Sequence, residues 1–271
     1  MKDIFKFVLW TVVIAFIIAG CGAKSGEQSV PKTDVSTAKV QRAESKPVLK
    51  VGTVAVNAPF EFIDEKTNEI TGFDTDFIKA VAQAAGMKAE ITHVEGDRLY
   101  PALETKEVDV LISAMIIGSS KVQEANFSEP YFEVKQLVAT LAGGAYKDLK
   151  SLTVQTVGVQ GNSTSQYNLE KTSGFKKDNI IPYSTIPDAL KDLLNGSVAA
   201  VVGDAPSILY FMQTNRDAKI DVYDANLGKE YFGIAVKKDN AKLLSKIDVA
   251  IKKVKETGKY DEIYKKYFNV D

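Results

Sequence analysis

The spacing of hydrophobic residues changes repeatedly along this chain, and the changes predict where strands and helices lie. From residue 48 to residue 113, short runs rich in β-branched residues alternate with stretches that carry apolar residues at helical spacing. The short runs predict strands over residues 48–54, 89–94 and 108–113. The helical spacing predicts helices over residues 76–85, which Gly86 ends, and 99–105.

The same alternation returns in the second half of the chain. It predicts strands over residues 156–160, 180–183 and 199–203, and helices near 165–170 and over 187–194. Two helices follow over residues 242–255 and 260–268, separated by Gly258. Strand–helix–strand units that recur in this way are typical of an α/β protein, and two similar α/β lobes are the simplest account of them.

The first 21 residues follow a different pattern, which is typical of a secretory signal. Lys2 and Lys6 lie near the start of an apolar run, residues 7–18, that is too short to span a bilayer comfortably. The run leads into Ile18-Ala19-Gly20-Cys21, which resembles the lipobox of bacterial lipoproteins. The resemblance implies that residues 1–20 are a lipoprotein signal peptide and that Cys21 is lipidated and anchors the protein to a membrane.

Cys21 is the only cysteine of the 271 residues. The domain that follows therefore has no thiol for a disulfide, for catalysis or for a metal site, and packing must stabilise it. Residues 22–47 are mostly polar and show little hydrophobic periodicity. We therefore expect residues 21–47 to form a lipidated, flexible tether.

Charge narrows the possible partners. Charged residues make up 25% of the chain, both signs are mixed, and the net charge is −1. Nucleic-acid binding needs a clustered basic surface, which this distribution does not predict. The lysines of the last two helices are expected to form a solvated face.

Six short motifs are distributed along residues 48–271. They are Gly52-Thr53 with Ala58-Pro59-Phe60-Glu61, Gly72-Phe73-Asp74-Thr75-Asp76, Leu103 to Asp109, Phe127-Ser128-Glu129-Pro130-Tyr131-Phe132, Gly158-Val159-Gln160-Gly161, and Gly258-Lys259-Tyr260 through Tyr267-Phe268. In this order and spacing the motifs resemble family 3 of the bacterial extracellular solute-binding proteins, the polar amino-acid-binding components of ABC importers.

The resemblance implies a two-lobed periplasmic-binding-protein fold of type II, with a ligand cleft between lobes that two crossover strands join. Those strands would be residues 131–138 and 231–236. The first lobe would comprise residues 48–134 and 232–271, and the second lobe residues 135–231. Hinge bending would close the lobes around a solute, because only the closed form lets both lobes contact it.

The resemblance also implies location and partners. The protein would be a lipid-anchored monomer outside the cytoplasm that captures a small polar solute, an amino acid or a close relative. It would deliver the solute to an ABC permease complex in the membrane. No cofactor, metal ion or nucleic acid is expected to take part.

Three residues of the second lobe match positions that hold an amino acid in this family. Ser163 and Thr164 open the helix after the strand at 156–160, where exposed N–H groups favour a carboxylate. Asp204 follows the strand at 199–203, at the carboxyl end where α/β sheets bind ligands, and is expected to bind the ammonium group. Each residue is also a suitable helix N-cap, and that alternative stays open.

The corresponding stretch of the first lobe departs from the family pattern. Ala114 lies in it, and Lys121 stands where the family carries a carboxylate-binding arginine. Lysine keeps the charge but loses the planar two-donor fork. Ile116 replaces a hydroxyl that helps to hold the ammonium group. A solvated lysine near a helix start is the alternative for Lys121.

The expected side-chain pocket is the least familiar part of the site. Asn57 and Gly96 replace positions that are usually aromatic, whereas Phe60 keeps an aromatic ring that could equally lie in the core. Val54 stands where many binders of cationic amino acids carry an aspartate, which makes arginine and lysine less expected as solutes. The sequence does not identify the solute further.

Three other functions remain as alternatives. A few relatives are cyclohexadienyl-dehydratase-like enzymes, but the only histidine, His93, lies at a predicted strand end without a partner motif, so no enzyme is expected. A binding protein that reports to a membrane receptor would have the same sequence features. The altered residues of the site could also serve a carboxylate or amine that is not an α-amino acid.

Overall fold

The computed structural model describes residues 46–118 and 124–268, all of which belong to one compact unit, Ser45–Asp271. The predicted signal peptide, Cys21 and almost all of the tether lie outside the described residues, and so does Lys121. No helix among the described residues is long and apolar enough to cross a membrane.

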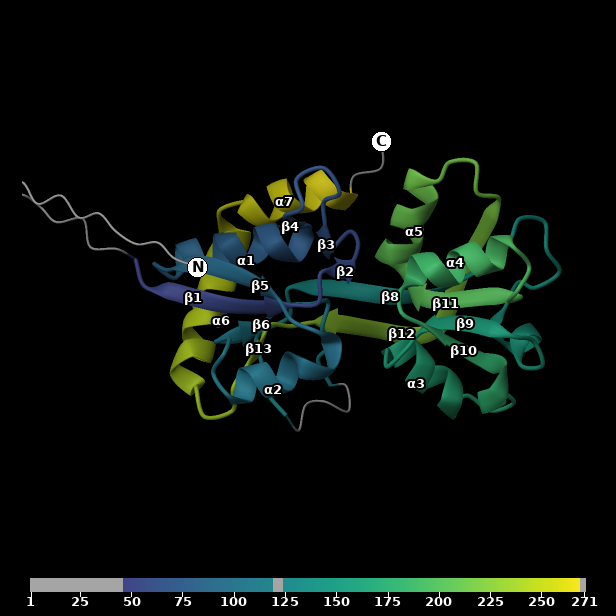
Figure 1. Ribbon diagram of the computed structural model, residues 1–271, viewed down its shortest axis with the longest axis horizontal. Coiled ribbons are helices and arrows are strands. Elements are labelled where there is room, and N and C mark those ends of the chain that lie inside the picture. The colour runs from purple at the N-terminus through teal and green to yellow at the C-terminus, as the bar shows by residue number, and fades with distance from the viewer. Residues whose placement is uncertain (1–45, 119–123, 269–271) are drawn as a thin grey trace, which may run out of the picture. The chain divides into compact units, whose positions relative to one another are not determined.

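The first lobe is built on a five-stranded sheet (Figure 1). Its strands are β1 (Val48–Thr53), β5 (Lys88–His93), β6 (Val110–Leu111), β7 (Asn126–Phe127) and β13 (Ala235–Val236). They lie in the order β5-β1-β6-β13-β7, with β1 parallel to both neighbours and β13 antiparallel to both of its own. The helices of this lobe are α1 (Phe73–Ala84), α2 (Leu99–Glu104), α6 (Ala241–Glu256) and α7 (Lys259–Phe268).

The second lobe has a five-stranded sheet of its own. Its strands are β8 (Phe132–Leu141), β9 (Val157–Gln160), β10 (Ile180–Tyr183), β11 (Ala200–Asp204) and β12 (Ile220–Phe232), and its helices are α3 (Thr164–Lys171), α4 (Ile186–Leu194) and α5 (Ala205–Thr214). The strand order is β10-β9-β11-β8-β12. A short 3-10 helix covers Gly96–Arg98 in the first lobe, and two more cover Leu149–Leu152 and Lys177–Asn179 in the second lobe. The two-lobed α/β fold expected from the sequence is confirmed.

Most predicted strands and helices are present within one or two residues of their expected bounds. Three differ in length. The strand expected over 108–113 is reduced to Val110–Leu111, the strand expected over 131–138 continues to Leu141, and α1 begins at Phe73 instead of residue 76. The 3.6-residue pattern marks where a helix buries its apolar face and not where its first turn forms, so the start of α1 was missed.

An antiparallel pair of strands, β8 and β12, connects the two lobes (Figure 1). Tyr231 pairs with Glu133 and Phe232 with Phe132 at one end of this pair, and a bulge between Asp224 and Lys229 interrupts it. The prediction of one continuous crossover strand over 231–236 is wrong, because β12 ends at Phe232 and β13 starts at Ala235. Apolar residues lie on both sides of the break, so the hydrophobic pattern predicted a single strand across it.

A three-stranded sheet, β2 (Val56–Asn57), β3 (Glu61–Ile63) and β4 (Ile70–Thr71), was not predicted. Strands of two or three residues are too short to show an alternating pattern. Gly72 follows this sheet with φ of 125°, and a Cβ at this position would lie 2.1 Å from the carbonyl oxygen of Phe60. The approach is close because the first N–H groups of α1 donate to Pro59 and Phe60 carbonyls at 2.9 and 2.8 Å.

An aromatic cluster fills the first-lobe core beneath the connecting strands. Phe60 is completely buried there, and its ring centroid lies 5.0 Å from that of Phe132 and 5.1 Å from that of Phe232. Phe73 and Phe268 complete the cluster, mostly in edge-to-face or tilted arrangements that aromatic pairs favour. Of the two roles left open for Phe60, the structure favours the core and does not place its ring in a pocket.

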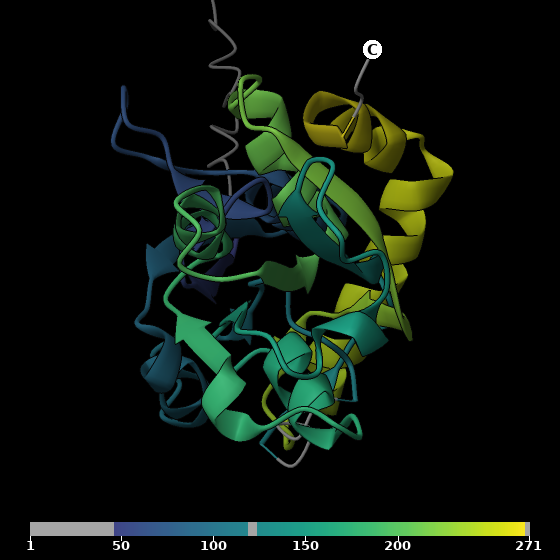
Figure 2. The ribbon, with the colours of Figure 1, turned by 90° about the vertical axis from the view of Figure 1, so that its right-hand side faces the viewer.

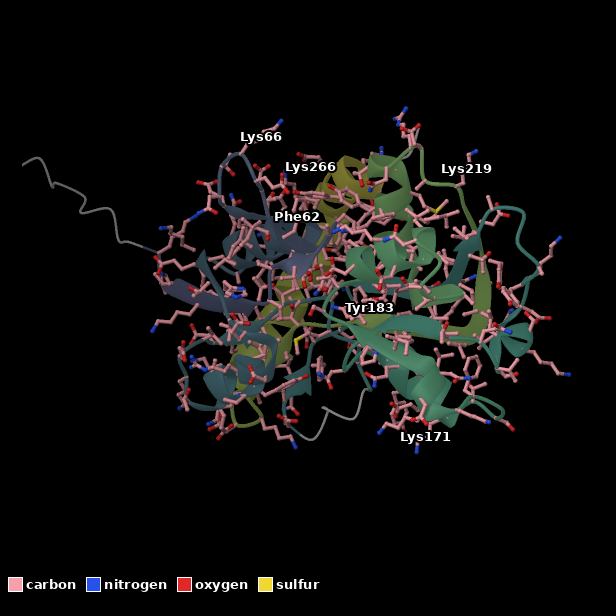
Figure 3. All side chains as sticks on the ribbon, turned by 45° about the vertical axis from the view of Figure 1, so that its right-hand side comes forward. Phe62, Lys66, Lys171, Tyr183, Lys219 and Lys266 are labelled. Carbon is pink, nitrogen blue, oxygen red and sulfur yellow. The ribbon has the colours of Figure 1, made fainter. Side chains whose placement is uncertain are left out.

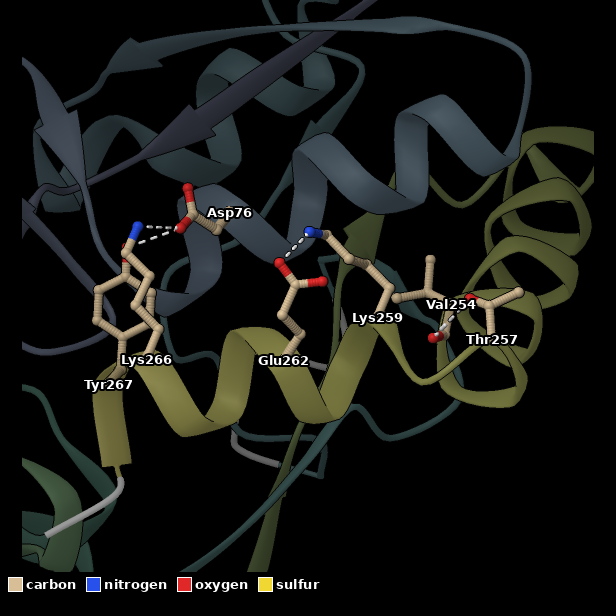
Figure 4. Close-up of polar contacts among 7 residues, drawn as sticks. All are labelled: Asp76, Val254, Thr257, Lys259, Glu262, Lys266 and Tyr267. Atoms are coloured by element: carbon tan, nitrogen blue, oxygen red, sulfur yellow. Dashed lines mark hydrogen bonds and ion pairs between the residues drawn. The ribbon is translucent and has the colours of Figure 1, made fainter. Parts of the chain in front are cut away.

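The C-terminal helices cover the first lobe and leave their lysines outside. Asp76 on α1 accepts hydrogen bonds from Lys266 Nζ at 2.6 Å and Tyr267 Oη at 2.8 Å, which fasten α7 to α1 (Figure 4). Because Lys266 is largely exposed, this ion pair contributes little stability by itself. Lys66, Lys171, Lys219 and Lys266 all lie at the periphery of the molecule (Figure 3).

Candidate functional site

The sheet of the second lobe places Asp204 beside a buried glutamine. Asp204 is the last residue of β11, and the register of β11 against β8 pairs it with Gln136. Gln136 is only 1% exposed, and its Nε2 donates a hydrogen bond of 2.5 Å to Asp204 Oδ1. The carboxylate therefore has a fixed position at the carboxyl end of the sheet, where the sequence predicted it.

The same glutamine connects Asp204 to a second acid, Glu230 on β12. Gln136 Nε2 also donates to Glu230 Oε2 at 2.9 Å, and its Oε1 accepts a hydrogen bond from the Ser165 hydroxyl. Thr164 Oγ1 donates to the same Glu230 oxygen at 3.1 Å. We refer to Asp204 and Glu230 as the carboxylate pair.

The electrostatics of the carboxylate pair favour a cation. Burial raises the pKa of Asp204 to about 7; the hydrogen bond from Gln136 lowers it and the charge of Glu230 raises it further. Neither acid forms an ion pair with a lysine or arginine in the part of the chain that the structure describes. Asp204 occupies the N-cap position of α5, but its side chain accepts no hydrogen bond from the first N–H groups of that helix. The alternative role as a cap is therefore not supported.

The start of α3 holds the other two second-lobe candidates. Ser163 is the N-cap: its Oγ accepts from Gln166 N at 3.2 Å and donates to the Gln160 carbonyl at 2.7 Å. The capping alternative is thus correct for Ser163. Thr164 faces Glu230 instead. An anion at this helix start would meet the N–H groups of the first turn, in competition with an acid of the same chain.

The first-lobe candidates lie on a buried polar network. Ala114 has φ of 47°, and its N–H donates to Asp74 Oδ2 at 2.8 Å. Glu61 Oε1 accepts from Asn57 Nδ2 at 2.5 Å and from Ser113 Oγ at 2.8 Å. Both acids are completely buried. The network thus fixes the backbone of the predicted binding stretch and the side chain of Asn57.

Both buried acids have raised pKa values. Burial and the charge of Asp74 raise the pKa of Glu61 well above its usual range, whereas burial raises the pKa of Asp74 only to about 6, because Ala114 and Tyr131 donate to it. Glu61 Oε2 has no hydrogen-bond partner among the described residues. The protonated form is therefore favoured more strongly for Glu61 than for Asp74.

This arrangement predicts an unusual dependence of stability on pH. Folded-state pKa values above the unfolded ones mean that stability is lost as the pH rises from the unfolded values toward the folded ones, because the unfolded chain then gives up protons that the folded chain still holds. Glu61→Gln keeps the shape of the side chain and cannot ionise, so its melting temperature is expected to decline less between pH 5 and pH 8 than that of the wild type. Differential scanning calorimetry measures both declines; equal declines would show that Glu61 is not a source of the pH dependence.

One hydrogen bond joins the two halves of the candidate site. Gln160 Nε2, at the end of β9, donates to Asn57 Oδ1 at 2.8 Å, and a small crevice between them is also lined by Pro187 and Ser207. The rings of Phe62 and Tyr210, from the two lobes, have centroids 6.1 Å apart. Asn57 is therefore the first-lobe candidate that the structure brings directly to the second lobe.

Loss of the Gln160–Asn57 contact should weaken ligand binding that requires closed lobes. Gln160→Ala is expected to lower affinity roughly 2- to 10-fold, the value of one neutral hydrogen bond. A double-mutant cycle with Asn57→Ala, followed by titration calorimetry, tests this, with the exposed Gln213→Ala as a control. Additive effects of the two substitutions would show that the contact does not stabilise the binding form.

The structure gives less support for a role of the remaining predicted residues in the site. Gly96 is exposed in a 3-10 turn, and a Cβ there would meet no atom within 4 Å. Ile116 forms a bridge with Phe232 and packs on the first-lobe core. His93 is exposed and contacts Glu95 at 3.3 Å. Lys121 lies outside the described residues.

The sequence did not indicate Gln136 or Glu230 as site residues. Both lie on the connecting strands, but only Gln136 falls within a predicted crossover strand, residues 131–138, whereas Glu230 precedes the other, residues 231–236. The pairing of Gln136 with Asp204 would have indicated them, but it depends on the strand register, which the sequence does not reveal.

A cavity of about 310 Å³ is lined by residues of α5, α7 and the start of β8. The green α5 and the yellow α7 both lie in the upper part of Figure 2. Tyr210, Tyr264, Tyr267 and Phe268 contribute most of the aromatic lining of the cavity, and none of the predicted site residues lines it. This cavity therefore does not identify the functional site.

Comparisons with known proteins give a consistent result. Residues 49–270 match the family described as bacterial extracellular solute-binding proteins, family 3. A probable histidine-binding protein of Neisseria gonorrhoeae is 32% identical over 94% of this chain and 91% of its own. The ABC transporter glutamine-binding protein GlnH of Bacillus subtilis (strain 168) is 28% identical over 100% and 99%. Among solved structures, the arginine-, lysine-, histidine-binding protein ArtJ of Geobacillus stearothermophilus is 38% identical, with a TM-score of 0.75 over 82% of this chain and 96% of its own.

Proposed function

Because the chain belongs to family 3 of the bacterial extracellular solute-binding proteins, we propose that it captures an amino acid between its lobes and delivers it to the permease of an ABC transporter. The observation that carries this proposal is Asp204, a carboxylate held at the carboxyl end of β11 by Gln136 and paired with no described lysine or arginine. The names of the relatives support the solute class, since they are binding proteins for histidine, glutamine or arginine. Those names also favour a binding protein over an enzyme.

In this proposal each end of the amino acid has its own site. The ammonium group pairs with Asp204, and the carboxylate meets the N–H groups at Thr164 and the start of α3. Lys121 supplies a positive charge from the first lobe, and Asn57, Gly96, Ala114 and Ile116 line the opposite wall. Ser163 contributes as the cap that fixes the helix start.

Closure follows from the way the lobes are connected. The pair β8 and β12 is the flexible link, and the first lobe comprises residues 48–134 and 232–271, the second residues 135–231. A solute that contacts both lobes favours the closed form by its differential affinity for that form. The Gln160–Asn57 hydrogen bond supports closure because it joins the lobes at the end of β9, the neighbour of β11 in the second-lobe sheet.

The family is extracellular by its description, and we propose that Cys21 supplies the anchor. Cleavage of residues 1–20 and lipidation of Cys21 would attach the protein to the membrane through the 21–47 tether, as a monomer beside its permease. Replacement of Cys21 by Ser removes the thiol to which the lipid would attach, so metabolic labelling with a radiolabelled fatty acid is expected to label the wild type and not the variant.

A thermal-shift screen tests the proposed solute class. Solutes that bind the folded state stabilise it by RT ln(1 + [L]/Kd), so an amino acid at 100 times its Kd adds about 2.7 kcal/mol. The screen should compare the 20 amino acids with polyamines and organic acids. A rise in melting temperature with an amino acid is the expected result, and a rise only with polyamines or organic acids would contradict the proposal.

A further inference from the structure

The carboxylate pair contains more negative charge than one ammonium group requires. Asp204 Oδ1 and Glu230 Oε2 accept from the same nitrogen and lie no more than 5.4 Å apart, the sum of the two hydrogen-bond lengths, 2.5 and 2.9 Å. Each acid keeps its other carboxylate oxygen without a donor among the described residues. The pair can therefore accept hydrogen bonds from two cationic groups, or from one group with several N–H donors.

The protein itself does not neutralise this charge within its described residues. Neither acid belongs to an ion pair there; the lysines nearest along the hinge strands, Lys135 and Lys229, pair with Asp224 and Glu133 instead. Gln136 is neutral and Thr164 is neutral, so both stabilise the acids by hydrogen bonds only. Two half-buried acids at this separation repel each other, and a cation between them relieves that repulsion.

We propose that Glu230 is a specificity-determining residue which, together with Asp204, selects amino acids that carry a second positive charge on the side chain. The inference rests on the proposed function and concerns the same site. A solute with an α-ammonium group and a guanidinium, amine or imidazolium group brings two positive charges to two acids. Its carboxylate remains for the start of α3. A neutral amino acid leaves one of the acids without a counter-charge.

Glu230 also bears on the expectation, drawn from Val54, that the solute is not arginine or lysine. Valine at position 54 replaces the aspartate that binds cationic side chains in many relatives, which made arginine and lysine less expected. The structure supplies an acid from a different element, β12, on the other side of the candidate site. A missing acid at residue 54 therefore does not exclude a cationic solute.

Matched pairs of solutes test the inference on the unmodified protein. Arginine and citrulline have nearly the same shape but differ by one positive charge; lysine and norleucine have the same carbon chain, and norleucine lacks the charged ammonium group. In titration calorimetry of the full-length chain at pH 7.5, the cationic member of at least one pair is expected to bind about tenfold or more tightly than its neutral partner. Equal affinities, or tighter binding of the neutral members, would overturn the role of the pair while leaving the proposed function in place. Absence of binding by every amino acid would overturn both.

Glu230→Gln assigns the preference to this residue. The substitution keeps the size and an acceptor oxygen, and the preference for the charged member is expected to fall to about threefold or less, with little change for the neutral one. Glu170→Gln, an exposed acid on the same lobe, is the control and should keep the wild-type preference. A Glu230→Gln protein that retains the full preference would exclude Glu230 as its source.

A pH series gives a second readout. Asp204 must lose its proton to bind a cation, so wild-type affinity for the cationic solute is expected to fall as the pH drops through about 7. The charge of Glu230 contributes to that high pKa, so in Glu230→Gln the fall should begin at lower pH. An unchanged pH profile would show that the two acids do not act together.

Discussion

Asp204→Asn is expected to weaken binding of the amino acid by at least about 30-fold, since removal of one partner of a desolvated charge pair costs roughly 2–5 kcal/mol. The asparagine keeps the size of the side chain and an oxygen that accepts from Gln136. It loses the negative charge that the ammonium group requires. Equilibrium dialysis with a radiolabelled amino acid measures the loss directly.

The control for this substitution is another acid of the same lobe. Asp217 is exposed, and Asp217→Asn is expected to leave the affinity unchanged. The melting temperature of Asp204→Asn without solute should equal or exceed that of the wild type, because burial raises the pKa of this acid and makes its charge costly. An Asp204→Asn protein that binds as tightly as the wild type would remove Asp204 from the site.

Gly72→Ala is expected to have the largest effect on stability among the substitutions considered. The added Cβ would lie 2.1 Å from the Phe60 carbonyl oxygen and 2.5 Å from its carbonyl carbon, and both are backbone atoms that α1 and β3 hold in place. The backbone of Gly72, with φ of 125° and ψ of 176°, also lies in a region that is essentially restricted to glycine. We expect a loss of about 3 kcal/mol or more, which corresponds to a fall in melting temperature of roughly 6–12 °C.

Gly86→Ala separates the effect of the clash from that of backbone conformation. Gly86 has φ of 72°, but a Cβ at this position meets no atom within 4 Å. Its substitution should cost only about 1 kcal/mol, the strain of a left-handed alanine. Thermal unfolding of both variants checks the difference, and equal losses would show that the contact with Phe60 does not matter.

The sequence predicted the elements that bury an apolar face and missed those that do not. The predicted helices and most strands of both sheets follow from hydrophobic spacing, whereas β7 and the part of β12 before residue 231 were not predicted. The β2–β4 sheet carries too few residues for any periodic signal, and the start of α1 is set by hydrogen bonds to Pro59 and Phe60 that are not encoded in local spacing. The break between β12 and β13 lies within an apolar stretch, so nothing in the pattern marked it.

The candidate site shows the same division. Asp204 was predicted because it matches an aspartate of the resembling family at the end of a strand that hydrophobic spacing predicts. Glu230 and Gln136 are polar residues inside strands, and only the pairing of β8 with β11 and β12 brings them to Asp204. Phe60 was assigned two possible roles because an aromatic residue in a loop serves a pocket and a core equally well. Its burial among the rings of Phe132 and Phe232 depends on contacts across the whole lobe.

Titration calorimetry of the full-length chain with each of the 20 amino acids is the direct test of amino-acid capture between the lobes. We expect saturable binding of one amino acid per chain, with a negative heat-capacity change because the closing lobes bury apolar surface. If none of the 20 amino acids gives saturable heat, the protein does not capture an amino acid.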